Sequence, residues 1–203
     1  MNINYGYGFL SDHDAALSVM TAVSNCTQQN ADELRQLEKY FCMLDNDGDS
    51  VLKHAIKANN HVALDIIYKS KHFHTIKGIQ NKGGEYAVFT AAVEGKVDIL
   101  RQLLSQPNNC RIMPPVCKKD AAPSILHEVI GLCRNSTIIF EILLDDLRNR
   151  NKYSADEVKY IISFHGNVDD HQYVDAYDLA LGTGRHEIAE MLVAFIHEYF
   201  LIT

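Results

Sequence analysis

The sequence contains no tryptophan, only four prolines and no apolar run near the roughly 18 residues that a membrane-spanning helix requires. Its first residues also lack the basic segment and the apolar stretch of a cleavable signal peptide. These absences predict a cytoplasmic protein that does not associate with membranes. Export by a route that reads no cleavable signal stays open.

Cysteine is sparse and odd in number, which argues against a disulfide framework. The five cysteines are widely spaced, and no pair has the CxxC spacing of redox or zinc motifs. A reduced compartment is the simpler interpretation. The cysteines are Cys26, Cys42, Cys110, Cys117 and Cys133.

Positive charge is scarce: the chain has 19 Lys and Arg residues and 26 Asp and Glu residues, which gives a formal net charge of −7. Residues 145–203 hold eleven acidic and five basic side chains, so this third alone carries −6. Binding to a phosphate backbone or an anionic membrane needs clustered Lys and Arg, so both partners are disfavoured. A partner protein with a basic surface is favoured instead.

Helical periodicity dominates the pattern of apolar residues. Spacings of three and four recur in Val97, Leu100 and Leu104, and again in Ile188, Leu192 and Phe195. Strand-like alternation of useful length does not occur. The sequence therefore predicts an all-α fold of many short helices joined by Gly, Asn, Asp and Pro turns.

Four segments repeat one plan of a short helix, a turn and a second helix rich in paired aliphatic residues. A small residue marks the first helix in three of them, at Ala55, Ala91 and Ala180, and Val129 takes that place in the other. The second helices cannot bury their apolar stripes alone, so neighbouring pairs are expected to stack. The segments span 48–67, 84–104, 124–144 and 175–192.

These segments resemble the ankyrin repeat, most closely in Ala91-Ala92 with Gly95 and in Ala180 with Gly184. The departures are clear: no segment keeps Thr-Pro, and only His127 occupies the family's His position. The marker residues are 36, 38 and 51 positions apart, against the family's repeat of about 33. The resemblance implies a helical solenoid of about five repeats, with insertions.

One repeat domain is expected to cover 1–203. Its parts are a degenerate N-terminal helix pair over 11–44, a repeat over 45–80, a repeat plus a long loop over 81–120, a repeat plus a helical insertion over 121–174, and a C-terminal repeat over 175–203. Asn30 is the expected N-cap of a helix over 31–44. Ser154 and Glu157 form a capping box that predicts a helix over 155–164 in the insertion. Residues 107–123 are expected to be a loop.

No metal or cofactor site is predicted. The run Asp45 to Asp49 resembles a calcium loop, but two of four ligand positions hold Met43 and His54. A repeat turn with an Asp N-cap is favoured instead. The ten histidines include the pairs His72/His74 and His165/His171, neither with the partners of a zinc finger.

Catalysis is not expected, although two enzymatic alternatives and one further non-enzymatic alternative stay open. Cys133 follows His127 and Glu128 by a turn or two, which would suit a Cys/His hydrolase or transferase. An enzyme could also place its site in the loop 107–123 or in the insertion 145–174, because long loops often carry function. The non-enzymatic alternative is a self-assembling module that pairs with itself through an end repeat. Cys26, Cys42 and Tyr177 are expected to be core residues.

The ankyrin resemblance implies a non-catalytic scaffold, a monomer that holds a partner protein on its concave face. Compact arrays of this kind also resemble effectors that intracellular bacteria deliver into host cells, which is a fold-level analogy. Carried over by alignment, the partner-binding residues are Asp49, His54, Lys57, Glu85, Tyr86, Thr90, Glu94 and Glu128.

Overall fold

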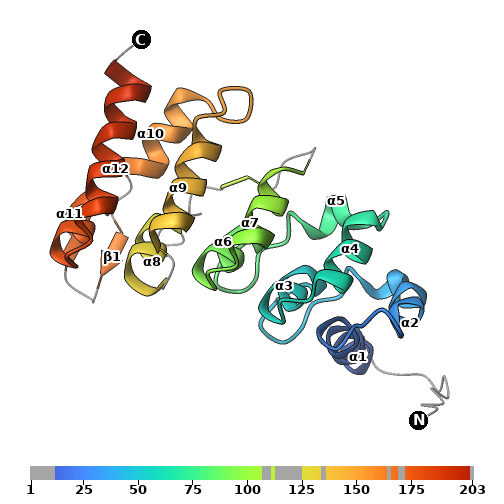
Figure 1. Ribbon diagram of the computed structural model, residues 1–203. Coiled ribbons are helices and arrows are strands. Elements are labelled where there is room, and N and C mark those ends of the chain that lie inside the picture. The colour runs from blue at the N-terminus through green and yellow to red at the C-terminus, as the bar shows by residue number, and fades with distance from the viewer. Residues whose placement is uncertain are drawn as a thin grey trace. The chain divides into compact units, whose positions relative to one another are not determined.

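The computed structural model describes residues 12–106, 111–112, 125–133, 136–163, 166–168 and 172–201. The chain forms two compact units, Met1–Lys82 and Gly83–Thr203, and the described part of each is built mainly from short helices (Figure 1). Within those residues, no helix combines the length and the hydrophobicity needed to cross a bilayer.

The first unit stacks two helix pairs. Its elements are α1 (Asp12–Ser24), α2 (Ala31–Gln36), the 3-10 helix η1 (Glu38–Tyr40), α3 (Val51–Lys57), α4 (His61–Lys69) and the single turn α5 (Phe73–Ile76). Helix α1 packs on α3, and α2 packs on α4. The N-terminal pair is therefore stacked on the next pair through both of its helices.

The helix expected over 31–44 is shorter than predicted and ends at Gln36. The chain then passes through η1, which turns Phe41 into the core. Asn30 is the N-cap residue of α2, as expected, but its side chain forms no cap hydrogen bond. Its Oδ1 accepts the Thr27 N–H at 2.6 Å instead.

The second unit stacks three helix pairs. They are α6 (Ala87–Val93) with α7 (Val97–Leu104), α8 (Ile125–Leu132) with α9 (Ser136–Leu147), and α11 (Ala176–Gly182) with α12 (His186–Ile196). First helices contact first helices, in the order α6, α8, α11, and second helices follow the order α7, α9, α12. The last helix continues as a π-helical turn, η2 (His197–Leu201).

The insertion before the last repeat contains the predicted helix, α10 (Ala155–Ser163). The capping box is confirmed: the Ser154 N–H donates to Glu157 Oε2 at 2.8 Å, and the Glu157 N–H donates to Ser154 Oγ at 3.2 Å. A hairpin that the sequence did not predict follows. Its strands are β1 (Gly166–Val168) and β2 (Gln172–Val174), antiparallel with Asn167 opposite Tyr173.

The turn between the two helices has the same geometry in three repeats. The residue four positions after each marker alanine has positive φ: Asn59 at 52°, Gly95 at 68° and Gly184 at 72°. The next residue donates its N–H to the marker alanine's carbonyl, over 2.9, 2.9 and 2.7 Å. This left-handed cap ends the first helix and reverses the chain. It also confirms the alignment of these repeats.

The core follows the repeat pattern. The marker residues Ala55, Ala91, Val129 and Ala180 are completely buried, as are paired aliphatics on the second helices such as Leu64. Two core predictions are wrong, because Cys42 and Tyr177 are exposed. Cys26 is buried as predicted. Most of the expected loop 107–123 lies outside the described residues, which include only Arg111 and Ile112 of it.

Candidate functional site

A buried charge cluster fixes the turn that leads into α3. The carboxylate of Asp49 is 2% exposed and accepts from Lys53 Nζ at 2.8 Å, Lys57 Nζ at 2.6 Å and Asn81 Nδ2 at 2.9 Å. Lys53 is completely buried. We call Asp49, Lys53, Lys57 and Asn81 the Asp49 cluster. The spacing of four residues places Lys53 and Lys57 on one side of α3, and Asp49 lies just before the start of that helix.

A second carboxylate organises the same turn from outside the helix. Asp45 Oδ1 accepts the N–H groups of Asp47 and Asp49 at 2.9 and 2.8 Å, and its Oδ2 lies 2.7 Å from His54 Nε2. Burial acts to raise the pKa of Asp45, but the contact with His54 and the backbone donors outweigh it and lower that pKa. The expected Asp N-cap is replaced by Ser50, whose side chain forms no cap bond.

The Asp49 cluster makes the stability of the folded protein depend on pH in the acidic range. Burial by itself would raise the pKa of Asp49, but the hydrogen bonds from Lys53, Lys57 and Asn81 lower it to about 2. The ordinary value is 3.8, so the unfolded chain binds more protons between pH 4 and 2. The stabilisation, about 2 kcal/mol, is therefore complete above the unfolded pKa and is lost as pH falls toward about 2.

Urea denaturation followed by circular dichroism at a series of acidic pH values measures this loss. All native carboxylates contribute to it, so the comparison is with Lys57→Met, in which Asp49 loses one of its donors. We expect the variant to lose less stability across the same interval. An identical pH dependence in the two proteins would contradict the role given to Asp49.

An acidic pair lies in the second unit. Glu85 follows Gly84 at the tip before α6, and Glu128 lies in the first turn of α8, the neighbouring first helix. The pKa of Glu128 is raised, chiefly because its carboxylate is partly buried and also because Glu85 is close enough to repel its charge. Stacking of adjacent repeats thus places the two carboxylates close enough for their charges to interact.

The other predicted residues of this unit differ in accessibility. Tyr86 precedes α6 and is half-buried, while Glu94 at the opposite end of α6 is exposed. Thr90 is 5% exposed, and its Oγ1 donates to the Tyr86 carbonyl at 3.5 Å. Thr90 therefore supports the helix from inside and offers no contact area at the surface.

Sequence reasoning selected Asp49, His54 and Lys57 but missed Lys53 and Asn81. The spacing of four residues could have suggested that Asp49, Lys53 and Lys57 lie close together. Nothing local predicts that Lys53 is fully buried or that Asn81, 32 positions from Asp49, completes the cluster. The same cluster argues against a calcium ion bound at this turn, because Lys53 and Lys57 of the chain itself already pair with Asp49.

The insertion carries a network of polar side chains that pair with one another and with residues 111–112. Tyr153 donates to Asp146 Oδ2 at 2.5 Å and accepts the Ile112 N–H at 2.7 Å. Lys152 Nζ lies 2.7 Å from Asp146 Oδ1. Burial and the neighbouring Asp146 raise the pKa of Tyr153, so the phenol stays protonated and acts as a structural hydrogen-bond donor. This network ties 111–112 to the start of the insertion.

The remaining enzyme and metal candidates find little support among the described residues. Cys133 is a buried thiol at the end of α8, which is unlike the accessible site of a nucleophile. In the part of the chain that the structure describes, no group of three or more His, Cys, Asp and Glu side chains is arranged to hold a metal ion. His165 and His171 lie outside the described residues.

Comparison with known proteins bears on the fold alone. No protein-family model and no curated protein sequence matches the chain. Solved structures similar to it include an ankyrin repeat domain from Acinetobacter baumannii AYE, with a TM-score of 0.57 and 17% identity over 88% of this chain and 97% of that one. Another is the structure of a predatory endopeptidase from Bdellovibrio bacteriovorus in complex with an immunity protein. There the identity is 17%, the coverage 87% and 96%, and the TM-score 0.45, too low to bear on function.

The stacking order, the shared turn geometry and the likeness to the Acinetobacter domain agree. First helices follow first helices, second helices follow second helices, and a left-handed residue separates the two in three repeats. The chain therefore has an ankyrin-repeat-like fold.

Proposed function

We propose that the protein is a non-catalytic binding module that holds a partner protein through a basic segment of that partner. The contact surface is the acidic face, which we define as Glu85, Tyr86, Glu94 and Glu128. The proximity of Glu85 and Glu128 supports this most directly, because a Lys or Arg side chain placed between two mutually repelling carboxylates would relieve the repulsion. Such charge-assisted contacts are strongest where the groups are partly desolvated.

The residues around this pair suit recognition. Tyr86 is half-buried beside Glu85 and offers an aromatic ring of the kind often found at interface centres. Glu94 extends the negative charge to the other end of α6. Asp49, His54 and Lys57, which the sequence assigned to the same surface, belong to the other compact unit. The proposal therefore concerns the second unit alone.

The acidic face is tested by neutralising it without changing its shape. The variant Glu85→Gln with Glu128→Gln removes two charges. Glu33→Gln with Glu141→Gln, both exposed elsewhere, is the matched control with the same net charge. Each protein is immobilised, and the proteins captured from a cell lysate are quantified by mass spectrometry at low and high salt.

We expect partners that the wild type and the control retain and that the double Gln variant binds at least about tenfold more weakly, the equivalent of about 1.4 kcal/mol. Their capture should also fall as salt rises, because the contact is electrostatic. An unchanged set of partners would move the site off this face, and the insertion over 145–174 would be tested next.

The narrower hypothesis that the partner belongs to a host cell rests on the fold-level analogy with bacterial effectors. The same capture tests it when lysates of different origin are compared. A partner found only in a eukaryotic lysate would support an effector role, and one found only in a bacterial lysate would contradict it.

A further inference from the structure

The last repeat has an exposed apolar face. Eight large hydrophobic side chains are exposed among the described residues, and α11 and α12 carry four of them. Helix α11 packs on α8 and helix α12 packs on α9. The pair α11 and α12 forms one end of its unit (Figure 1). The four side chains are Tyr177, Leu181, Val193 and Ile196, of which Val193 is 52% exposed.

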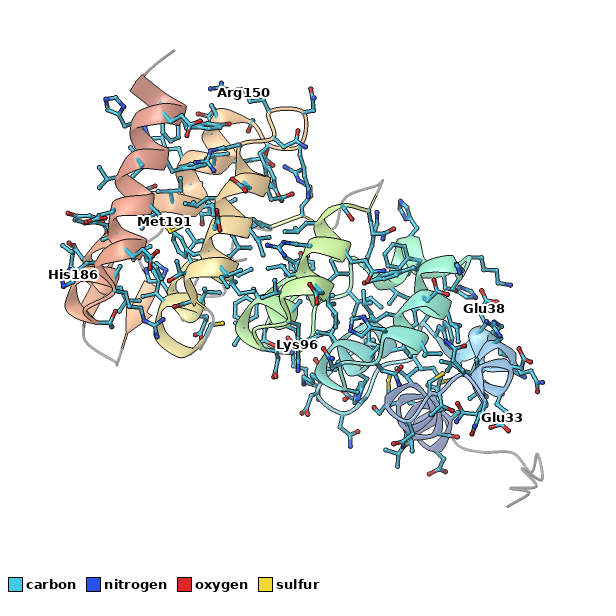
Figure 2. The ribbon with its side chains drawn as sticks, in the orientation of Figure 1. Glu33, Glu38, Lys96, Arg150, His186 and Met191 are labelled. Carbon is cyan, nitrogen blue, oxygen red and sulfur yellow. The ribbon has the colours of Figure 1, made fainter. Side chains whose placement is uncertain are left out.

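Three of these four exposed side chains border a shallow groove. It has a volume of about 680 Å³ and runs between α11 and α12, with Tyr177 and Leu181 contributed by α11 and Val193 by α12. Figure 2 shows His186 on this outer side of α12, whereas Met191 points toward α9, with whose residues it lines a different hollow. A repeat array normally closes such an end with polar side chains, because an apolar end favours further stacking.

Polar side chains on the groove are arranged so that the surface can complement a second copy of itself. Four side chains form one stripe that runs along α12 and ends at the first residue of η2. They follow one another at spacings of four, three and four residues: His186, Glu190, Val193 and His197. A two-fold contact places each residue against the symmetry-related position of an identical surface. About a centre between Val193 and Ala194, Glu190 lies three residues before Val193 and His197 lies three residues after Ala194. A carboxylate and an imidazole at equal distances from an apolar centre fit such a contact.

We propose that this face binds the same face of a second copy of the chain, with the two α12 helices antiparallel and crossing at Val193 and Ala194. Glu190 of each copy then lies opposite His197 of the other, twice in the dimer. A histidine N–H can donate to a carboxylate whether or not the ring is charged. Tyr177 and Leu181 cover the apolar centre from both sides. The proposal replaces the sequence-based expectation of a monomer.

The opposite end of the chain fits this face less well. Among the described side chains of helix α1, one large hydrophobic residue is exposed, Leu17, which is 59% exposed. A head-to-tail contact would therefore set the apolar face against described residues with little exposed apolar surface, and it would generate an open chain of copies rather than a closed pair. The two-fold contact covers apolar surface with apolar surface.

The test is the mass of the protein in solution, measured by sedimentation equilibrium over a range of concentrations. We expect a monomer–dimer equilibrium for the wild type and a monomer for Val193→Asp, which places two like charges at the crossing point. Leu17→Asp is the matched control and should dimerise normally. A monomeric wild type would overturn the proposal and leave the face to another protein. Loss of assembly in Leu17→Asp, or larger polymers, would mean head-to-tail contact and would overturn it too.

The pairing of Glu190 with His197 is tested by exchanging charges. His197→Glu sets two carboxylates against each other at both contacts and should weaken dimerisation about tenfold or more. Adding Glu190→Lys to it restores opposite charges and should recover the dimer. Failure of the double variant to recover would rule out the antiparallel register. Both side chains are exposed, so circular dichroism should be unchanged, and binding at the acidic face is a separate measurement.

Discussion

Asp49→Ala is expected to lower the free energy of unfolding of the first unit by about 3–5 kcal/mol, the usual cost of removing one partner from a buried ion pair. The substitution leaves the ammonium group of Lys53 in an interior site without the carboxylate that it contacts at 2.8 Å. It also removes the acceptor for Asn81, which connects the chain after α5 to the turn before α3. Urea denaturation followed by circular dichroism measures the loss.

The matched control is another aspartate paired with lysine at the same spacing. Asp65 and Lys69 contact each other at 2.7 Å on α4, but both side chains are more than half exposed. Asp65→Ala should therefore cost at most about 1 kcal/mol. A loss from Asp49→Ala no larger than that from Asp65→Ala would show that the Asp49 cluster behaves as a solvated surface pair.

A double variant separates the loss of attraction from the burial of an uncompensated charge. Lys53→Met in the Asp49→Ala background removes the buried ammonium and keeps an unbranched apolar stem. We expect it to recover about 1–3 kcal/mol, because the two residues are in direct contact and their effects do not add. If the second substitution instead destabilises the protein further, Lys53 contributes mainly through its packing.

The repeat architecture could be predicted because it follows from local patterns. The marker alanines, the residue with positive φ four positions later and the paired aliphatics each recur at a fixed offset, and a period of 3.6 places them on faces. The capping box at Ser154 and Glu157 is equally local and is confirmed. The short hairpin was not predictable this way, since strands of three residues provide too few positions for an alternation to be visible.

The sites depend on contacts that no local pattern encodes. Lys53 follows the apolar residues Val51 and Leu52, and its contact with Asp49 four residues earlier is local. Its complete burial depends on tertiary packing, as does the contact of Asn81 with Asp49. The same holds for Glu128, whose proximity to Glu85 requires two repeats to stack. Alignment to the ankyrin pattern placed both glutamates on one surface, but it could not tell that Thr90, which it assigned to the same surface, is buried.

Ala91→Leu is the second substitution with a large expected effect, about 1–3 kcal/mol of lost stability in the second unit. Ala91 is completely buried on α6, which packs against both α7 and α8. Its carbonyl also accepts the Lys96 N–H at 2.9 Å and closes the turn to α7. A branched side chain at this position has to push helices apart or adopt a strained rotamer.

Ala58→Leu is the comparison that isolates overpacking from helix propensity. Ala58 is exposed and follows α3 in the right-handed helical conformation, so a larger side chain projects into solvent and should change stability by about 0.5 kcal/mol or less. Chemical denaturation of both variants gives the difference. Equal midpoints for Ala91→Leu and the wild type would mean that α6 can move away from its neighbours without cost. The close contact attributed to the marker alanines would then not hold even in the repeat that matches the ankyrin pattern best.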